Sequence, residues 1–572
     1  MILVALSWGW IGITSFLVGF AVMEGIGKVT GRVKPASMEL HILMGLLCLT
    51  VYAQVFSLFG GVGKIATLLL AVVSILLLVT FRKKIVRYIV YMWTKIRGWG
   101  YGPCLLAVLI VLLLVYITAG NTWHYDTELY HAQAIRWIEQ FGVVKGLGNL
   151  HNRFAYNSAF FCLQALFSLK FAVNQSLHSL NGFVAAVMLC YAAGTLNIWK
   201  KERLTTSDFY KIGIFIYFSY LENSLLISSP GSDLLTLCMV LYISAKWAEL
   251  IERQEREPVE YGILCLLAVW TVTIKLSAGL LVFLAVYPAV TLIRQKRWKE
   301  IFFFLGVGVL TVAPFLIRNV YVSGYLVYPY SSLDFFNVDW KMAASVAADD
   351  SREIMAWGRG MTSRTMYDAD FSIWFPRWFD NQQGMIKTLF LFNIVCMVIL
   401  AGYSVRIILR KRKDCGASML LLSVSAAQVI MWFVTAPLIR YGLTYMLLLP
   451  AFLLGLICHK INSRVMAWAI CVAGIYCGTA CIVQVADNFT ETYWKRPADY
   501  NWREARSVVW GNMEVYVPEG SDCIGYHYFP STPHASRLEA IELRTGNLEG
   551  GFRLKEEYRE KEFNSMGVVV GE

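Results

Sequence analysis

The stretch PCLLAVLIVLLLVYITAG (residues 103–120) decides the fold, because it has no charged residue over a length that can cross a lipid bilayer. A helix needs about 20 mostly apolar residues to cover the hydrocarbon core. Similar runs recur along the chain, in which 57% of the 572 residues are apolar and 16% are charged. Soluble domains carry about 25% charged residues, so the sequence predicts an all-α polytopic membrane protein.

Counting these runs predicts about 14 transmembrane helices. The stretch 158–173 is also apolar, but a crossing there would break the alternation between loops rich in Lys and Arg and loops with few charges. It is therefore expected to be a juxtamembrane or re-entrant helix beside a water-filled cavity. The predicted spans are 1–23, 39–59, 64–80, 103–120, 178–199, 209–227, 233–251, 260–274, 276–293, 301–318, 386–405, 417–437, 441–458 and 464–485.

Lys and Arg concentrate in alternate connections between these spans, and such loops face the cytoplasm. Both termini and the large loops 121–177 and 319–385 are then extracytoplasmic, in a multi-pass protein of the plasma (inner) membrane. The formal net charge of +12 comes from these basic loops, so no nucleic-acid partner is predicted. The basic connections are 24–38, 81–102, 200–211, 246–258, 294–300, 404–418 and 459–464.

The chain divides into three predicted parts. N-terminal helices occupy 1–102, a transmembrane core with the two outer loops occupies 103–485, and a small extracytoplasmic C-terminal α+β domain occupies 486–572. In this last part, Pro- and Gly-containing turns separate candidate strands. The expected strands are 514–517, 523–529 and 540–543.

The first outer loop carries the most chemistry, in the stretch NTWHYDTELYH (residues 121–131). Apolar residues recur every three positions from Leu129 to Ile138, which predicts an amphipathic interfacial helix that begins near Asp126 and ends at Gly142. One alternative is that Asp126 has no role other than N-cap of this helix. A second alternative is a divalent metal, zinc or manganese, held by His124, Asp126, Glu128 and His131.

Several motifs lie at the outer ends of predicted spans: Asp126-x-Glu128-x-Tyr130, the stretch 149–158, Pro314 to Pro329, and Ala436 to Tyr441. In this order they resemble the GT-C glycosyltransferases, multi-pass enzymes that include protein O-mannosyltransferases and the aminoarabinose transferase of lipid A. The resemblance covers about residues 101 to 450 and is closest to an uncharacterised bacterial branch. Three spans precede the usual first helix of that superfamily, and their role stays open.

The resemblance implies an activity and its catalytic residues. In the GT-C superfamily the Asp of the first loop is the catalytic base, and the matching residue is Asp126, with Glu128 as the second acid. The implied reaction moves a sugar from a polyprenyl-phosphate donor to a lipid, glycan or protein acceptor on the extracytoplasmic side.

The positions of three cations suit a lipid-phosphate donor. Lys275 interrupts the apolar run 260–293, which is too long for one span and suits two short spans that meet at the outer face. Arg318 and Arg440 lie at comparable outer ends. Arg can hold a phosphate through two parallel hydrogen bonds. We therefore expect an inverting displacement in which Asp126 accepts the proton of the acceptor hydroxyl while these cations stabilise the departing lipid phosphate.

A pocket for the sugar or the acceptor is expected from nearby polar and aromatic residues. Aromatic rings stack on the CH faces of sugars, and carboxylates accept hydrogen bonds from their hydroxyls. The candidates are Tyr130, His131, His151, Arg153, Asn157, Asp233, Trp340 and Trp374.

Two other classes of function remain open from the sequence. A secondary transporter or lipid flippase would show paired halves and polar breaks near the midplane. A polysaccharide polymerase or ligase would share the outer-loop arginines and would require a diphosphate-linked donor.

Overall fold

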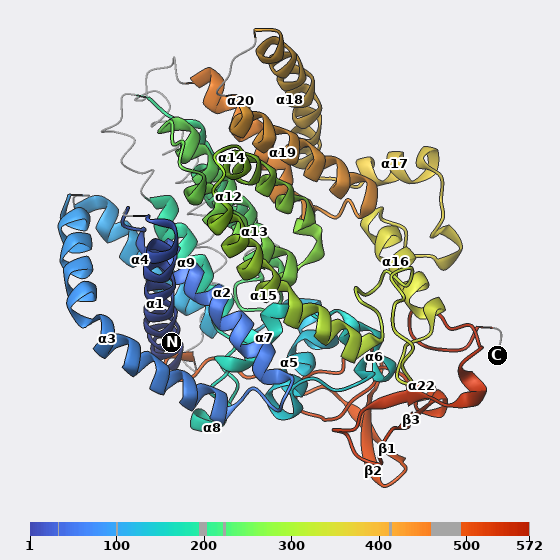
Figure 1. Ribbon diagram of the computed structural model, residues 1–572. Coiled ribbons are helices and arrows are strands. Elements are labelled where there is room, and N and C mark those ends of the chain that lie inside the picture. The colour runs from blue at the N-terminus through green and yellow to red at the C-terminus, as the bar shows by residue number, and fades with distance from the viewer. Residues whose placement is uncertain are drawn as a thin grey trace.

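Helices make up most of the computed structural model, which describes residues 1–32, 34–98, 101–193, 203–220, 225–410, 415–458 and 493–570 (Figure 1). Within these residues, nine helical segments are long and apolar enough to cross a membrane. The prediction of a mostly helical chain is thereby confirmed, and these segments agree with the predicted polytopic membrane protein. The nine are α1 (Ile2–Thr30), α2 (Met38–Ser57), α3 (Lys64–Arg97), α12 (Asp233–Glu252), η4 with α14 (Leu276–Arg294), α15 (Trp298–Ser323), α18 (Gly384–Leu409), α19 (Gly416–Thr435) and α20 (Ile439–Cys458).

Shorter helices occupy four more of the predicted spans. They are α4 (Tyr101–Ala119), α9 (Leu180–Ala193), α10 (Thr206–Ser219) and α13 (Pro258–Ile274). The last predicted span, 464–485, lies outside the described residues. The count of about 14 crossings therefore stays a prediction.

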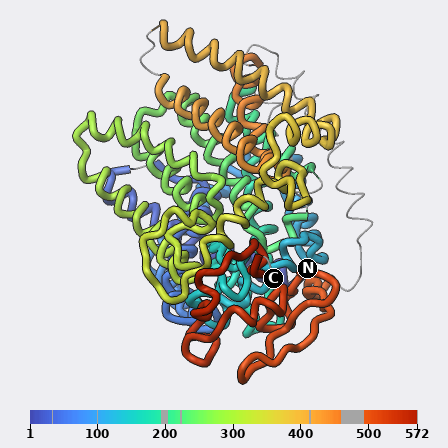
Figure 2. The backbone as a smooth tube through the Cα atoms, turned by 90° about the vertical axis from the view of Figure 1, so that its right-hand side faces the viewer, coloured from blue at the N-terminus to red at the C-terminus, as the bar shows by residue number. Residues whose placement is uncertain are grey.

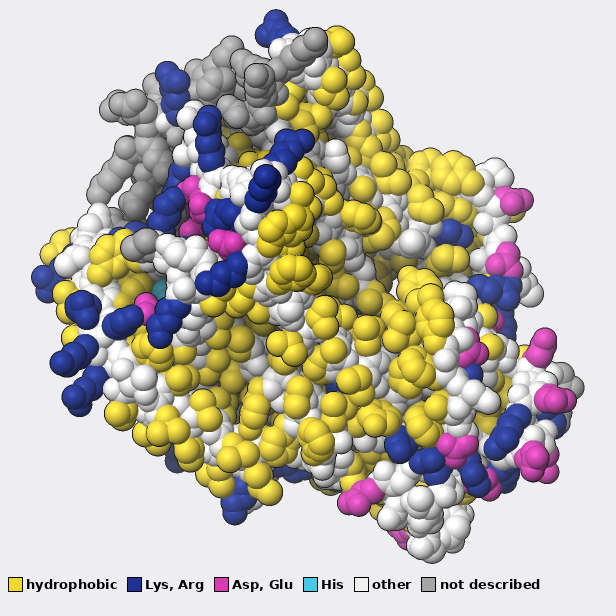
Figure 3. Space-filling model, viewed as in Figure 1, with side chains coloured by type: hydrophobic (Ala, Val, Ile, Leu, Met, Phe, Trp, Pro, Cys, Tyr) yellow, Lys and Arg dark blue, Asp and Glu magenta, His cyan; other side chains and the backbone are white. Residues whose placement is uncertain are grey.

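Side-chain types divide the visible surface into zones (Figure 3). Hydrophobic side chains cover the middle of this face, Lys and Arg gather toward its upper left, and both charge signs mix at its lower right. An apolar belt between polar ends is what a bilayer-spanning bundle requires.

Small residues allow α1 and α2 to pack closely. A Cβ atom on Gly19 would lie 1.7 Å from the His41 carbonyl oxygen, and one on Gly45 would lie 1.8 Å from the Ser15 carbonyl oxygen. No other residue type fits these two positions without separating the helices, which is the usual way in which membrane helices approach each other.

The break expected at Lys275 is present. Helix α13 ends at Ile274, Lys275 has an extended backbone (φ −152°, ψ 126°), and the chain resumes as the 3₁₀ helix η4 (Leu276–Ala285) before α14 (Val286–Arg294). The interruption places the Lys275 side chain at the junction of two short apolar segments.

The first outer loop folds into short helices: η1 (Thr127–His131), α5 (Ala132–Phe141), α6 (Leu147–Leu150), η2 (Asn152–Ala155), α7 (Ala159–Leu166) and α8 (Lys170–Val173). Helix α7 has 8 residues and is too short to cross a bilayer, as predicted for this stretch. Gly142 ends α5 with a φ of 75°. The apolar face of α5 is buried in protein instead of lying in the lipid interface, because α7 and the C-terminal segment cover it.

The second outer loop contains α16 (Ala344–Gly358), η5 (Arg364–Met366) and α17 (Phe371–Asp380). The C-terminal segment forms two small antiparallel sheets, β1 (Ala505–Trp510) with β2 (Met513–Pro518) and β3 (Ile541–Leu543) with β4 (Phe552–Leu554), together with α22 (Ser536–Ala540) and η7 (Glu556–Tyr558). It lies at the same end of the molecule as the first outer loop (Figure 2).

The predicted strand 523–529 is wrong. Its carbonyl groups bond to side chains of α5 and not to a neighbouring strand: Gln133 donates to Tyr528, and Arg136 donates to Tyr526 and His527. The predicted strands 514–517 and 540–543 correspond to β2 and, within one residue, to β3.

Candidate functional site

Asp126 precedes η1, and its side chain does not cap that helix. Its Oδ2 atom accepts a hydrogen bond of 3.0 Å from Nη2 of Arg440 instead. The alternative that Asp126 is only an N-cap is therefore wrong for its side chain. Within the described residues, the Oδ1 atom of Asp126 accepts no hydrogen bond.

Arg440 lies in the first turn of α20, after the chain has left α19 through Ala436 and Pro437. Besides Asp126, it donates to Nε2 of His124 and to the hydroxyl of Tyr441, the latter at 2.7 Å. Its Nε atom is 3.6 Å from Oδ2 of Asp233. One guanidinium thus connects the first outer loop to the start of α12.

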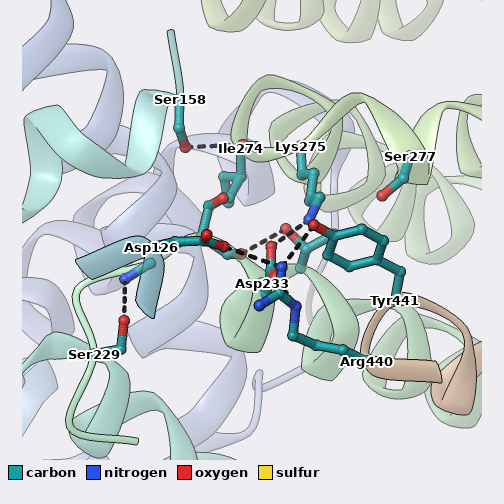
Figure 4. Close-up of polar contacts among 12 residues, drawn as sticks. Asp126, Ser158, Ser229, Asp233, Ile274, Lys275, Ser277, Arg440 and Tyr441 are labelled. Carbon is teal, nitrogen blue, oxygen red and sulfur yellow. Dashed lines mark hydrogen bonds and ion pairs between the residues drawn. The ribbon is translucent and has the colours of Figure 1, made fainter. Parts of the chain in front are cut away.

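Asp233 is the first residue of α12 and also forms an ion pair with Lys275. The Lys275 ammonium lies 3.9 Å from the centroid of the Tyr441 ring. We call Asp126, Asp233, Lys275 and Arg440 the charge cluster; Figure 4 shows these side chains converging with Tyr441 from four separate parts of the chain. The exposed fractions of their side chains are 22%, 11%, 26% and 17%, so water can reach the charges.

Buried polar contacts fix the turn before α12. Nδ2 of Asn181 donates to the carbonyl oxygens of Ser229 and Gly231 at 2.6 and 2.8 Å. Thr127 in η1 bonds to the hydroxyl of Ser229 at 2.8 Å. A Cβ atom on Gly231 would lie 2.8 Å from Cε1 of His131, so glycine allows the turn to approach that ring. Asp233 and Asp126 are held near each other by these contacts.

Burial and charge act in opposite directions on the ionisable groups of this loop. Burial by itself would raise the pKa of Asp126, but the charge of Arg440 leaves that pKa below its ordinary value. Burial lowers the pKa of His124 and lowers the pKa of His131 to about 3. Both imidazoles are therefore neutral at pH 7, and the carboxylate of Asp126 is ionised.

The metal alternative has no donor set in the described residues, where no group of three or more His, Cys, Asp or Glu side chains could hold an ion. Glu128 turns away from Asp126 to the C-terminal segment. Its carboxylate accepts hydrogen bonds from Nε of Arg503 at 2.6 Å and from Asn501 at 2.7 Å. Glu128 and Asp126 thus have different partners, although only one residue separates them in sequence.

Arg318 does not join the charge cluster. It is buried between helices, where it donates to Oδ1 of Asn157 at 3.1 Å and to the hydroxyl of Ser57. Asn157 in turn donates to the Phe315 carbonyl oxygen at 3.1 Å. These contacts connect α2, α15 and the first outer loop.

Arg153 belongs to a second buried network, centred on Asp350 of α16. Its guanidinium is 3.7 Å from Asp350 and 3.6 Å from Glu353. Asp350 is fully buried and also accepts hydrogen bonds from Tyr156, Tyr328 and Asn152. His151 is bonded to the Leu129 carbonyl oxygen and to Asn152.

The remaining predicted pocket residues lie in aromatic packing. Tyr130 packs edge-on against His131 with ring centroids 4.3 Å apart. Trp340 donates to the Val320 carbonyl oxygen, and the cations of Lys145 and Arg544 lie 5.0 and 4.8 Å from the centroid of its ring. Trp374 is buried against Phe433, 5.6 Å between ring centroids. Of the predicted acceptor residues, Asp233 alone belongs to the charge cluster, within the residues that the structure describes.

Tyr441 was not among the predicted site residues, although it contacts both cations of the charge cluster. Its place directly after Arg440 is the signal that could have identified it. His124 entered the prediction only as a metal ligand, whereas in the structure it accepts a hydrogen bond from Arg440.

The model of a family described as a domain of unknown function, DUF8201, matches residues 1–447, and the chain belongs to this family. The matched range contains all four residues of the charge cluster. No curated protein and no solved structure matches the chain.

Proposed function

We propose that this chain is an inverting membrane glycosyltransferase. It would move a sugar from a polyprenyl-phosphate donor to a lipid, glycan or protein acceptor on the extracytoplasmic side of the plasma membrane. The observation that carries the proposal is the contact of Asp126 with Arg440, beside Lys275, at the ends of apolar helices. A carboxylate next to two water-accessible cations suits a reaction that needs a base and releases a phosphate.

In the proposed reaction, the acceptor hydroxyl gives its proton to Asp126 as its oxygen bonds to the anomeric carbon. The bond between that carbon and the phosphate oxygen breaks, and the lipid phosphate leaves with one more negative charge. Lys275 and Arg440 stabilise this charge, and attack from the opposite face inverts the anomeric configuration.

The charge cluster has two carboxylates and two cations, so it is balanced before any ligand binds. A donor phosphate must therefore share Arg440 or Lys275 with Asp126 and Asp233. When the phosphate draws Arg440 away, the pKa of Asp126 rises, because Arg440 is the charge that lowers it. Donor binding would thus convert a weak base into a stronger one.

The test is sugar transfer from a labelled polyprenyl-phosphate monosaccharide by the purified full-length protein. Asp126→Asn should lower the rate by about 10² to 10⁴, the usual contribution of a general base. Asp334→Asn is the control, because Asp334 is an exposed outer-loop carboxylate paired only with Lys341 in the described residues. An Asp126→Asn protein that transfers sugar at the wild-type rate would contradict the proposal.

The same preparation separates the other functions. Substrate uptake or lipid scrambling in vesicles, without transfer, would identify a transporter or flippase. A requirement for a diphosphate-linked oligosaccharide would identify a polymerase or ligase.

A further inference from the structure

A second group of cations is separate from the charge cluster. It lies where the end of α1 meets the middle of α3. Five basic side chains line a hollow of about 590 Å³ there, together with Val79, Thr80 and Phe81. All five are exposed. Within the described residues, Glu24 is the acid that contacts this group, through Lys84. The five are Lys28, Arg82, Lys83, Lys84 and Arg87.

The hollow has a well-packed floor. Phe81 packs edge-on against Phe20, with ring centroids 6.0 Å apart, and Tyr88 packs against the same ring at 5.9 Å. The Tyr88 hydroxyl donates to the Ala36 carbonyl oxygen at 3.1 Å. The backbone that carries the cations is therefore held against α1 and the start of α2.

An apolar stripe leads along α3 to the hollow. Its residues follow one helix face and have exposed fractions from 51% to 67%, so this face is turned away from the protein. Figure 1 shows α3 at the left margin of the molecule, and Figure 3 shows Lys and Arg side chains at the same margin. The stripe consists of Ile65, Leu68, Val72, Leu76 and Val79.

We propose that this hollow binds the headgroup of an anionic glycerophospholipid, whose acyl chains lie along the α3 stripe. The ligand must be amphiphilic, because the cations begin directly after the lipid-facing apolar stretch. It must be anionic, because five cations face one carboxylate. Basic pockets beside transmembrane helices bind such headgroups.

The alternative is that these cations reflect only the orientation of the chain in the membrane and attract all anionic lipids equally. A matched pair of variants separates the two readings. The pocket variant carries Lys28→Gln, Lys83→Gln and Arg87→Gln, and leaves the contact of Lys84 with Glu24 in place. The control carries Lys299→Gln, Arg406→Gln and Arg410→Gln, which removes the same charge from exposed positions outside the hollow.

Lipid binding is measured by native mass spectrometry of the full-length protein from nanodiscs. The nanodiscs contain phosphatidylethanolamine with either phosphatidylglycerol or the two-phosphate lipid cardiolipin. Each cation contributes about fivefold to affinity, so the pocket variant should bind anionic lipid about 100-fold more weakly than wild type. The control should change affinity by less than about threefold, because its cations do not line the hollow.

Equal losses in both variants, or wild-type protein that retains no anionic lipid, would overturn the proposal. A second measurement needs no variant. A photoactivatable cardiolipin should crosslink wild-type protein at residues 79–87 or at Lys28, and crosslinks confined to other helices would also overturn it.

Discussion

Arg440 contacts more members of the site than any other described residue, and its shape explains why. The planar guanidinium donates to Asp126, His124 and Tyr441 in different directions, and an ammonium cannot reproduce that geometry. Arg440→Lys keeps the charge but loses this arrangement. We expect kcat/KM for sugar transfer to fall about 100-fold, the loss typical of removing one preorganised donor.

The control for this substitution is Arg377→Lys, because Arg377 is an exposed arginine of α17 that reaches only methionine sulfurs in the described residues. Melting temperatures of both proteins show whether folding is affected. Wild-type kcat/KM in Arg440→Lys would mean that charge alone suffices at this position.

Buried histidines predict how stability depends on pH. The pKa of His131 and that of His151 are each lowered to about 3 by burial, whereas an unfolded histidine titrates near 6.5. Between these values the unfolded chain binds protons that the folded chain does not. Each histidine therefore costs about 1.4 kcal/mol of stability for every pH unit below 6.5.

The measurement is the melting temperature between pH 7.5 and 5.5, which should fall as the pH decreases. His131→Asn should have a shallower pH dependence than wild type, because it removes one of the groups that protonate on unfolding. A variant with the wild-type slope would show that His131 is not a source of the acid sensitivity.

The sequence predicted which charged residues lie where apolar runs end, but not where their side chains point. Asp126, Lys275 and Arg440 were all expected at the outer ends of spans, and they meet. Arg318 was expected at the same depth, but its side chain contacts Asn157 and Ser57 instead. The ends of apolar runs locate a residue along its helix, whereas the rotation of each helix about its axis depends on packing.

At the level of elements, the helices were predicted where apolar runs are long, and the strands were predicted poorly. The break at Lys275 follows from the length of a single run. Strand β1 was missed because its residues lie near the surface and show little alternation, and β4 has three residues. Residues 523–529 have strand-like composition, but long-range contacts with α5 determine their conformation.

Glu128 joins two elements that are far apart in sequence, η1 and the segment before β1. We expect Glu128→Gln to release residues 493–504 to protease, because Gln cannot form the ion pair with Arg503. The energetic loss should be about 1 kcal/mol, since the Arg503 side chain is 46% exposed and water screens the pair. Sugar transfer should stay close to the wild-type rate.

Limited proteolysis and the transfer assay, performed together, decide the role of Glu128. Glu504→Gln is the control, because Glu504 is an exposed carboxylate in the same segment. If Glu128→Gln abolishes transfer while the segment stays protected, Glu128 acts in catalysis as the GT-C resemblance implied.

At the scale of the whole molecule, three segments that are distant in sequence form one assembly. Asp350 from the second loop bonds to Tyr156 from the first, and Asn152 of the first loop accepts a hydrogen bond from Arg537 of the C-terminal segment at 3.4 Å. The family match ends at residue 447, before that last segment begins. Contacts across 194 and 385 residues leave no periodic pattern in a sequence, so no local rule predicts them.

Asp350 is the carboxylate on which this assembly depends, and its removal should weaken the whole outer side. Asp350→Asn leaves Arg153 with only Glu353 as an acidic partner in the described residues. Breaking a buried pair costs about 3 to 5 kcal/mol, so the melting temperature should fall and the C-terminal segment should become protease-sensitive. Asp368→Asn is the control, because it removes an exposed pair with Arg352 that water screens. Equal melting temperatures for the two variants would show that the outer segments are held together elsewhere.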